Sequence, residues 1–270
     1  MAMKISILQL DIKFGQVDVN INNVCAILES LEKVDNFELH VIILPEMWSC
    51  GYDLISLDEY AQRTPEIIEL LKKYAIKLGA YIVPGSLPWC PTYLKKKTGV
   101  FNTTFMIDPK GKIINEYSKM HLFRLMQEEK YMQPGDKFNK VSIGNEAIIS
   151  QFICYDLRFP EIFRKMAEQG TNIFIIVAQW PNPRMHHWRS LLIARAIENQ
   201  AFVIAANRSG EDQIGSFFGH SMVINPWGDV IFEAPEASNI YTCVIDPSEA
   251  SALRQKLPFL KDRRLDIYQF

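Results

Sequence analysis

Residues 147–161 read AIISQFICYDLRFPE, an apolar run that ends in a cysteine followed by charged and aromatic residues. The run from Ala147 to Ile153 has the length and composition of a buried strand, and Cys154 follows it directly. In α/β proteins, sites are assembled at strand ends from side chains that are distant in the sequence. This stretch therefore predicts a buried strand that carries a thiol to a candidate site.

Working outward, short runs rich in Ile and Val alternate with amphipathic segments along the whole chain. This alternation is typical of an α/β architecture. The expected strands are 4–10, 39–44, 80–83, 102–107, 113–117, 147–153, 173–177, 202–206, 220–224, 230–232 and 241–245. The expected helices are 20–33, 64–79 and 186–199, the second opened by Thr64-Pro65-Glu66 and closed by Gly79.

One segment is echoed later in the chain: FMIDPKGKIINE (105–116) aligns without gaps on MVINPWGDVIFE (222–233). Both predict two strands joined by a tight Asx-Pro-x-Gly turn. Such hairpins are common, so the echo is either a coincidence or the mark of a pseudo-symmetric fold with two facing sheets. Because run 39–44 is apolar on both faces, it needs cover on both sides. We therefore expect a four-layer α-β-β-α sandwich.

Composition narrows the class of protein. The chain has 270 residues, of which 48% are hydrophobic and 22% charged, and this balance excludes wholesale disorder. The net charge of −2 gives no basic field for nucleic acid or an anionic membrane, and Lys95-Lys96-Lys97 is interpreted as a solvated loop tip. No linker or low-complexity block divides the sequence. We expect a single domain over residues 1–270, with a C-terminal tail at about 246–270.

The cysteines and histidines argue against a metal or disulfide framework. Five scattered cysteines, without a C-x-x-C pair, indicate reduced thiols. His186-His187 has no carboxylate or cysteine at ligand spacing, so neither a metal nor a cofactor is expected. No signal peptide and no membrane-length apolar run is found in the sequence. These features favour a cytoplasmic location.

Three ionisable residues stand at or after predicted strands: Glu46 in VIILPEMWSCGY, Lys119 in NEYSKMHLFR, and Cys154. Only a few per cent of a free thiol is ionised to thiolate at neutral pH, so a nucleophilic cysteine needs neighbouring groups that promote loss of its proton. A nearby cation lowers the thiol pKa, and a nearby carboxylate can remove its proton. Lys119 and Glu46 are the right residue types, although each, taken singly, is more typical of a surface or capping role.

Together, LPEMW (44–48), YSKMHLF (117–123) and CYDLRFPE (154–161) resemble the three signature motifs of the nitrilase superfamily of carbon–nitrogen hydrolases. Their order and their separations of 73 and 35 residues agree with that family. The resemblance covers nearly the whole chain. It implies an αββα fold, a Glu-Lys-Cys triad without metal or cofactor, and dimers that extend the sandwich.

The resemblance also implies roles. Glu46 would act as general base and Cys154 as nucleophile toward an amide carbonyl. Lys119 and the backbone N–H of Tyr155 would stabilise the oxyanion. A second family glutamate, which positions the lysine and the substrate, maps to Glu128, with Glu129 as the neighbouring alternative.

The block from Cys154 to Gly210 is similar to the ω-amidase branch, whose members hydrolyse the terminal amide of small ω-amido-dicarboxylates such as 2-oxoglutaramate or 2-oxosuccinamate. A substrate carboxylate calls for a cation, and Arg158 is the first candidate, with Arg184 as runner-up. The structural alternative for Arg158 is a salt bridge to an acid such as Glu198. Three aromatic residues are either pocket walls or core: Tyr52, Phe123 and Trp180.

Other functions remain open from the sequence. Within the superfamily, the substrate could be an N-carbamoyl amide or deaminated glutathione. A catalytically silent scaffold would keep the fold without needing the three motifs. A Cys-His protease would pair Cys154 with His121 or His220, but no local signature of such proteases is present. The leading hypothesis is a cysteine amidase acting on a small carboxylated amide.

Overall fold

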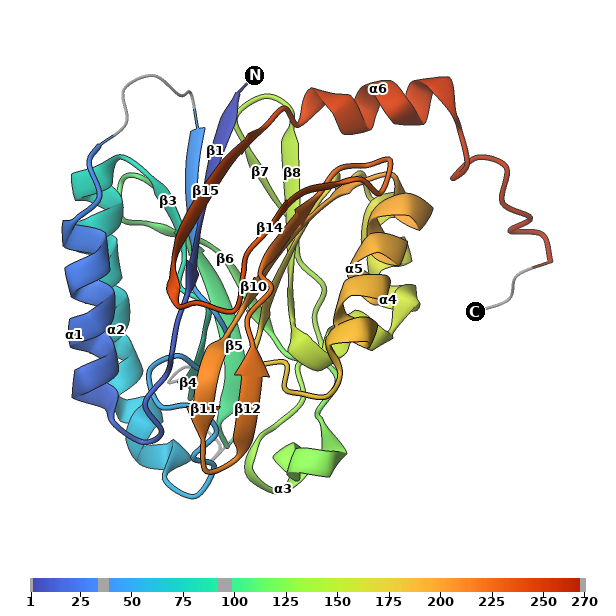
Figure 1. Ribbon diagram of the computed structural model, residues 1–270. Helices are drawn as coiled ribbons and strands as arrows, with labels where there is room; N and C mark the ends of the chain where they lie inside the picture. Colours follow the sequence, from blue (N-terminus) through green and yellow to red (C-terminus); the bar gives the residue numbers. More distant parts are fainter. Residues whose placement is uncertain (1, 34–38, 92–98, 268–270) are drawn as a thin grey trace.

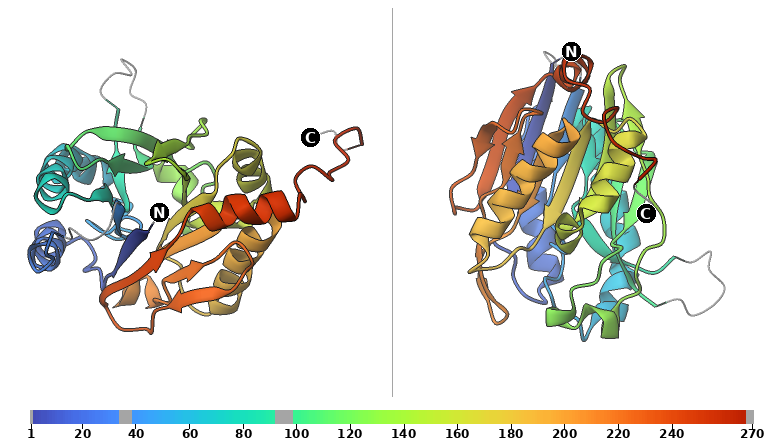
Figure 2. Two further views of the ribbon diagram at one scale, coloured as in Figure 1. Left: turned by 90° about the horizontal axis from the view of Figure 1, so that it is seen from above. Right: turned by 90° about the vertical axis from the view of Figure 1, so that its right-hand side faces the viewer.

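The computed structural model describes residues 2–33, 39–91 and 99–267, so the run Lys95 to Lys97 lies outside the described part. Two β-sheets pack face to face in these residues, and helices cover both outer faces (Figures 1 and 2). Helices α1 (Val17–Glu29) and α2 (Leu57–Leu78) cover one sheet, and α4 (Pro160–Glu168) and α5 (Met185–Asn199) cover the other. The expected four-layer α-β-β-α sandwich is confirmed.

The first sheet has the order β15-β1-β2-β3-β5-β4, with β6 also paired to β5. Its strands are β1 (Met3–Gln9), β2 (Leu39–Ile43), β3 (Tyr81–Val83), β4 (Ser86–Trp89), β5 (Phe101–Ile107), β6 (Ile113–Ser118) and β15 (Asn239–Ile245). The second sheet has the order β14-β13-β10-β9-β8-β7. Its strands are β7 (Val141–Ile143), β8 (Ala147–Ile153), β9 (Ile173–Ala178), β10 (Phe202–Asn207), β13 (Met222–Ile224) and β14 (Val230–Glu233).

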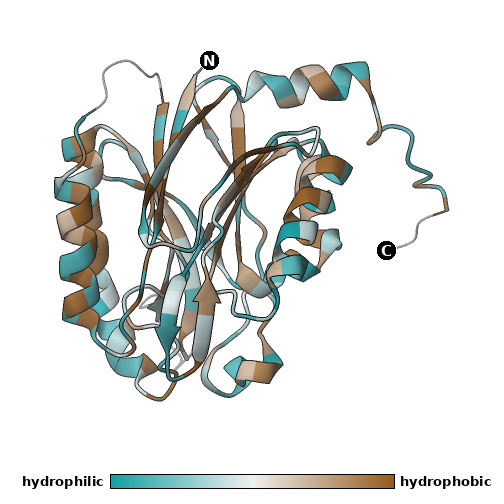
Figure 3. Cartoon of the chain, in the orientation of Figure 1, coloured by the Kyte–Doolittle hydropathy of each residue, from teal (hydrophilic) through white to brown (hydrophobic). Residues whose placement is uncertain are grey.

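The core lies between the layers. In β2, Val41 and Ile43 point toward the second sheet, while Ile42 points toward the helices on the other side. Both faces of this strand are buried, which explains its unbroken apolar run. Figure 3 shows the same pattern, with strongly hydrophobic strands inside and helices of mixed colour outside. None of the helices in the described residues is both long and apolar enough to cross a membrane.

The two echoed segments form matching hairpins, β5–β6 and β13–β14, at the margins of the two sheets. In each turn, the Asx side chain accepts two backbone N–H bonds: Asp108 from Lys110 and Lys112, and Asn225 from Trp227 and Asp229. Both ladders also shift register next to the turn. The hairpins are built alike, as the pseudo-symmetric interpretation predicts.

Three helices differ from expectation. Helix α2 begins at Leu57, before Thr64, and Pro65 lies inside it, because Leu57 and Ala61 bury an apolar face that the sequence pattern does not reveal. Helix α4 was not expected, although Pro160 stands in its first turn. Helix α6 (Ser248–Lys256) lies within the segment expected to be a tail, and it crosses the top of the molecule in Figure 1.

Strands β1, β2 and β3 run parallel in the first sheet, and β8, β9 and β10 run parallel in the second. The hairpin of β11 (Ser209–Asp212) and β12 (Gly215–Phe218) follows β10, at the lower end in Figure 1. The short helix α3 (Glu128–Tyr131) lies at this end too. Segments that are distant in the sequence thus meet beyond the strand ends.

Candidate active site

Glu46 stands three residues beyond β2, in a loop held close to the loop that follows β3. Its side chain is fully buried. Gly85, with a positive φ of 63°, permits this approach, because a Cβ there would lie 1.9 Å from the Pro45 carbonyl oxygen. The two loops can therefore lie against each other next to Glu46.

Lys119 follows β6 and is also fully buried. Its backbone N–H donates to the Asn102 carbonyl (2.9 Å), and its own carbonyl accepts from the Gly135 N–H (2.8 Å). The residue is thus fixed on both sides, and its side chain is directed into the interior.

Cys154 begins the 3₁₀ turn η2 (Cys154–Arg158) directly after β8. Its φ of 46° lies in the left-handed region, which a residue with a Cβ rarely adopts. Strained backbone of this kind is maintained only where the surroundings enforce it, and it is frequent at active sites. The sharp turn leaves the thiol at the end of the strand, 7% exposed.

The structure brings the three side chains together. Lys119 Nζ lies 3.0 Å from Glu46 Oε1 and 2.7 Å from Glu128 Oε1. The charges of Glu46, Lys119 and Glu128 all act on the pKa of the Cys154 thiol, so the thiol lies within their electrostatic reach. Glu128 is fully buried, whereas Glu129 is exposed.

The two oxygens of Glu46 have different partners. Oε1 accepts from the Tyr52 hydroxyl (2.6 Å), Asn102 Nδ2 (2.8 Å) and Lys119 Nζ. Oε2 accepts only the backbone N–H of Gln179, at 2.9 Å, among the contacts in the described residues. Oε2 therefore has the spare lone pair that can receive a proton from the thiol.

The electrostatics make the thiol neutral at rest. Burial, and then the charge of Glu46, raise the pKa of Cys154 well above its usual range. The charge of Lys119 lowers the thiol pKa, as expected, but this effect is smaller than the combined effects of burial and Glu46. For Lys119, burial alone would lower the pKa, but the charges of Glu128 and Glu46 overcome it and the pKa is raised. The site thus holds a carboxylate and an ammonium beside a thiol whose neutral form is favoured.

Comparison with known proteins agrees with this geometry. The carbon-nitrogen hydrolase family profile matches residues 4–255. The chain belongs to the carbon-nitrogen hydrolase family. It is 41% identical to the 2-oxoglutaramate amidase of Bacillus subtilis over 99% of this chain and 100% of that protein.

Two solved structures are similar throughout. One is a CN-hydrolase superfamily protein from Xanthomonas campestris with an arsenic adduct in its active site (TM-score 0.86, 30% identity, 100% and 98% of the two chains). The other is Nit3 of Saccharomyces cerevisiae, a member of branch 10 of the nitrilase superfamily (TM-score 0.86, 25% identity, 97% of each chain). The resemblance to the nitrilase superfamily is confirmed, and the protein is an amide-hydrolysing enzyme.

In this carbon-nitrogen hydrolase, a pocket opens onto the thiol. All five residues predicted for substrate contact line it, and the complete lining is Tyr52, Phe123, Met126, Cys154, Tyr155, Arg158, Gln179, Trp180, Pro181 and Arg184. The Arg158 guanidinium stacks 4.7 Å from the Trp180 ring centroid. The alternative of a salt bridge between Arg158 and Glu198 is wrong. Glu198 pairs instead with Arg195 (2.9 Å). Neither pocket arginine, Arg158 or Arg184, forms an ion pair within the described residues.

The histidines are engaged away from the thiol. His121 Nδ1 lies 2.8 Å from Asp156 Oδ1, and its ring stacks on Phe159. His220 Nδ1 contacts Glu233 at 2.9 Å. Neither histidine forms a hydrogen bond to Cys154 in the part of the chain that the structure describes. The Cys-His protease alternative therefore has no geometric support.

Two contributors to the site were missed from the sequence. Asp156, fully buried, accepts from the Tyr117 hydroxyl and from the backbone N–H of Ile153 and His121. Gln179 fixes Glu46 from the end of β9, through its backbone N–H and through Nε2 to the Glu46 carbonyl (2.7 Å). The motif CYDLRFPE contains Asp156, but only the fold shows what its carboxylate binds.

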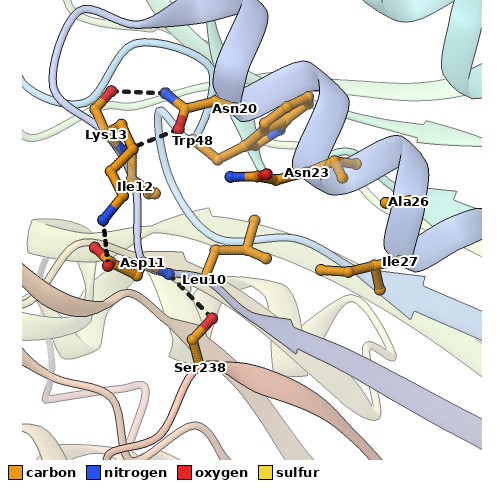
Figure 4. A pocket seen from close by; sticks show the side chains of 11 residues that line it. Leu10, Asp11, Ile12, Lys13, Asn20, Asn23, Ala26, Ile27, Trp48 and Ser238 are labelled. Carbon is orange, nitrogen blue, oxygen red and sulfur yellow. Dashed lines mark hydrogen bonds and ion pairs between the residues drawn. The ribbon is translucent and has the colours of Figure 1, made fainter.

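A larger hollow, of about 480 Å³, lies beside α1 and away from the thiol (Figure 4). Several of its polar side chains bind one another or the nearby backbone: Lys13 pairs with Asp11 at 2.6 Å, and Asn20 bonds the Lys13 backbone. Within residues 2–33, 39–91 and 99–267, no group of three or more His, Cys, Asp or Glu side chains could hold a metal ion. The triad pocket is therefore the candidate active site.

Proposed function

We propose that this enzyme is an ω-amidase that hydrolyses the terminal amide of small ω-amido-dicarboxylates, of the 2-oxoglutaramate type, to carboxylate and ammonia. One observation carries the proposal: a thiol close to a buried carboxylate–ammonium pair shares its pocket with two arginines that form no ion pair within the described residues. The identity to the 2-oxoglutaramate amidase of Bacillus subtilis supports the same substrate class.

In the first half-reaction, Cys154 Sγ attacks the amide carbon while Glu46 Oε2 takes the thiol proton. The carbonyl oxygen becomes an oxyanion, stabilised by Lys119 Nζ and the Tyr155 N–H. The C–N bond then breaks as protonated Glu46 returns its proton to the leaving nitrogen. Ammonia departs, and the acyl group remains on sulfur as a thioester.

In the second half-reaction, water replaces ammonia beside Glu46. The carboxylate takes a proton from this water as its oxygen attacks the thioester carbon. The second oxyanion occupies the same site as the first. The C–S bond then breaks, the proton held by Glu46 returns to sulfur, and the carboxylic acid product is released.

Substrate selection is assigned to the arginines. The Arg158 guanidinium lies over the Trp180 ring, and this contact restricts the side chain before a carboxylate binds, so little side-chain entropy is lost on binding. Arg184 lies 6.0 Å from the Phe123 ring and is the second cation at the pocket. We propose that Arg158 binds the distal carboxylate of the substrate, with Tyr52, Phe123 and Trp180 as walls.

We further propose a homodimer in the cytoplasm. Helix α5 exposes Met185 and Ile197 on its outer face, and Trp227 is exposed as well. A second copy of the chain would remove such apolar surface from water and extend the sandwich. The five free cysteines fit a reducing compartment.

Ammonia release from 2-oxoglutaramate tests the function. We expect turnover by the purified enzyme, no turnover by Cys154→Ala, and an acyl adduct on Cys154 in mass spectra after brief exposure. Arg158→Met should raise KM for 2-oxoglutaramate more than for an uncharged amide of similar size. Ammonia release from N-carbamoyl amino acids or deaminated glutathione, but not from 2-oxoglutaramate, would show that the proposed substrate is wrong and would leave the proposed mechanism intact. No ammonia from any amide would favour the scaffold alternative.

A further inference from the structure

The hydroxyl of Tyr52 lies between two carboxyl groups. Its oxygen is 2.6 Å from Glu46 Oε1 and 2.9 Å from Glu128 Oε1, and all three side chains are buried. A phenol carries one hydrogen, so it can donate to only one of these oxygens at a time. In the second contact, the Tyr52 oxygen and a carboxyl oxygen also lie at hydrogen-bond distance. The hydrogen of that second bond must therefore come from the carboxyl group.

The hydrogen-bond partners indicate which carboxyl group is protonated. Glu46 accepts from Asn102, Lys119 and the Gln179 N–H in addition to Tyr52, an environment that stabilises a carboxylate. Glu128 accepts from Lys119 (2.7 Å) and from the Phe123 N–H (2.8 Å). With fewer donors around it, Glu128 is the group better placed to keep a proton.

The charge balance leads to the same assignment. Two buried carboxylates and one ammonium would leave a net negative charge away from water, which is costly. A neutral Glu128 leaves Glu46 and Lys119 as a balanced pair. In addition, burial and the charge of Glu46 raise the pKa of Glu128 against the opposing effect of Lys119.

We propose that Glu128 is a neutral carboxylic acid in the resting enzyme, and that Tyr52 accepts its proton in a hydrogen bond while donating its own hydroxyl hydrogen to Glu46. Tyr52 is therefore a positioning residue that links the neutral acid Glu128 to the general base Glu46. The titratable groups around this chain are Glu46, Glu128, Lys119 and Cys154. The kinetic consequence rests on the proposed amidase function, but the protonation state does not.

The protonation state is tested by infrared spectroscopy of the full-length enzyme without substrate. A protonated carboxylic acid has a carbonyl stretch distinct from that of a carboxylate. We expect the difference spectrum between the parent enzyme and Glu128→Gln to contain this band at neutral pH. The matched control is Glu129→Gln, which alters an exposed neighbour and should lose only a carboxylate band. A carboxylate band in the Glu128→Gln difference would overturn the proposal.

The role of Tyr52 is tested with Tyr52→Phe, which keeps the ring and removes the hydroxyl. Without this donor the Glu46 carboxylate loses one of its four hydrogen bonds and is less well positioned, so kcat should fall with little change in KM. Tyr60→Phe is the control, because its hydroxyl has the same 2.6 Å contact with a carboxylate, Asp53, away from the thiol.

An unchanged kcat in Tyr52→Phe would contradict the role of Tyr52. In the infrared spectrum, Tyr52→Phe should shift the Glu128 band, which requires no substrate. Absence of any amidase activity in the parent enzyme would refute the proposed function and leave the infrared result to decide the proton assignment.

Discussion

At the scale of the residue, the site depends on buried charges that are useful only in combination. Lys119 is fully enclosed and faces two carboxyl groups, and Cys154 has an uncommon positive φ. Asp156 joins these two parts, since it binds His121 beyond the lysine and Ile153 before the cysteine. Neither the base, the ammonium nor the thiol would be positioned by its own segment alone.

Lys119→Met should lower turnover by roughly 10²–10³ or more, because the oxyanion loses a charged donor. The same substitution leaves Glu46 and Glu128 without their shared cation. We therefore expect a loss of thermal stability as well. Steady-state kinetics and melting curves check this. Unchanged turnover in a folded variant would remove the oxyanion role.

Asp156→Asn tests the link between the two loops. An amide presents one acceptor oxygen and two N–H donors, so it cannot accept all the hydrogen bonds that the carboxylate accepts. We expect the free energy of unfolding to fall by about 2 kcal/mol or more, and kcat to fall with little change in KM. Urea unfolding and kinetics measure both. The exposed Asp136→Asn serves as control and should change neither. A loss of stability without any loss of kcat would show that the link does not position the site.

At the scale of the element, contacts across the chain override local patterns. Pro65 is tolerated within α2 because the helical residues before it and after it pack against the first sheet. Helix α6 buries Ala250 and Leu253, and one charged side chain adds hydrogen bonds to neighbouring segments. Arg254 donates to the carbonyl oxygens of Thr171 (2.6 Å), Asn199 (2.9 Å) and Gln200 (3.2 Å), where α5 ends.

Arg254→Met should therefore release α6 from the second sheet. Three carbonyl groups lose a charged donor, and we expect a loss of about 2 kcal/mol in the free energy of unfolding. Amide hydrogen exchange in 248–256 should become fast while exchange in β8 and β9 stays slow. Lys256→Met, which alters an exposed position in the same helix, is the control. Equal protection of α6 in both variants would contradict this role for Arg254.

At the scale of the whole molecule, the last strand, β15, returns from the second sheet and pairs with β1 in the first. A buried histidine lies beside this junction. His40 Nε2 contacts the Ser6 hydroxyl (2.9 Å), which in turn contacts Thr242 (3.1 Å), so β2, β1 and β15 are joined. Burial, and then the charge of Lys4, lower the pKa of His40 to about 4.

This pKa predicts how acid affects the whole fold. Between pH 6.5 and about 4, the unfolded chain binds a proton at His40 and the folded chain does not, so stability falls as pH decreases. The loss levels off below pH 4 and amounts to at most about 3 kcal/mol. In urea unfolding at several pH values, His40→Gln should flatten this decline, whereas the exposed His186→Gln should not. An equally steep decline in His40→Gln would contradict the prediction.

The sequence by itself determined the alternation of strands and helices, the matching hairpins and the motifs that carry Glu46, Lys119 and Cys154. These features are local, because apolar periodicity and turn chemistry act over a few residues. Only the tertiary structure decided that Glu128 rather than Glu129 faces Lys119, that Arg158 forms no ion pair in the described part of the chain, and that Tyr52 lies between two carboxyl groups. The physical reason is that protonation and hydrogen bonding depend on burial and on distances of about 3 Å between segments far apart in the chain, and local sequence contains neither.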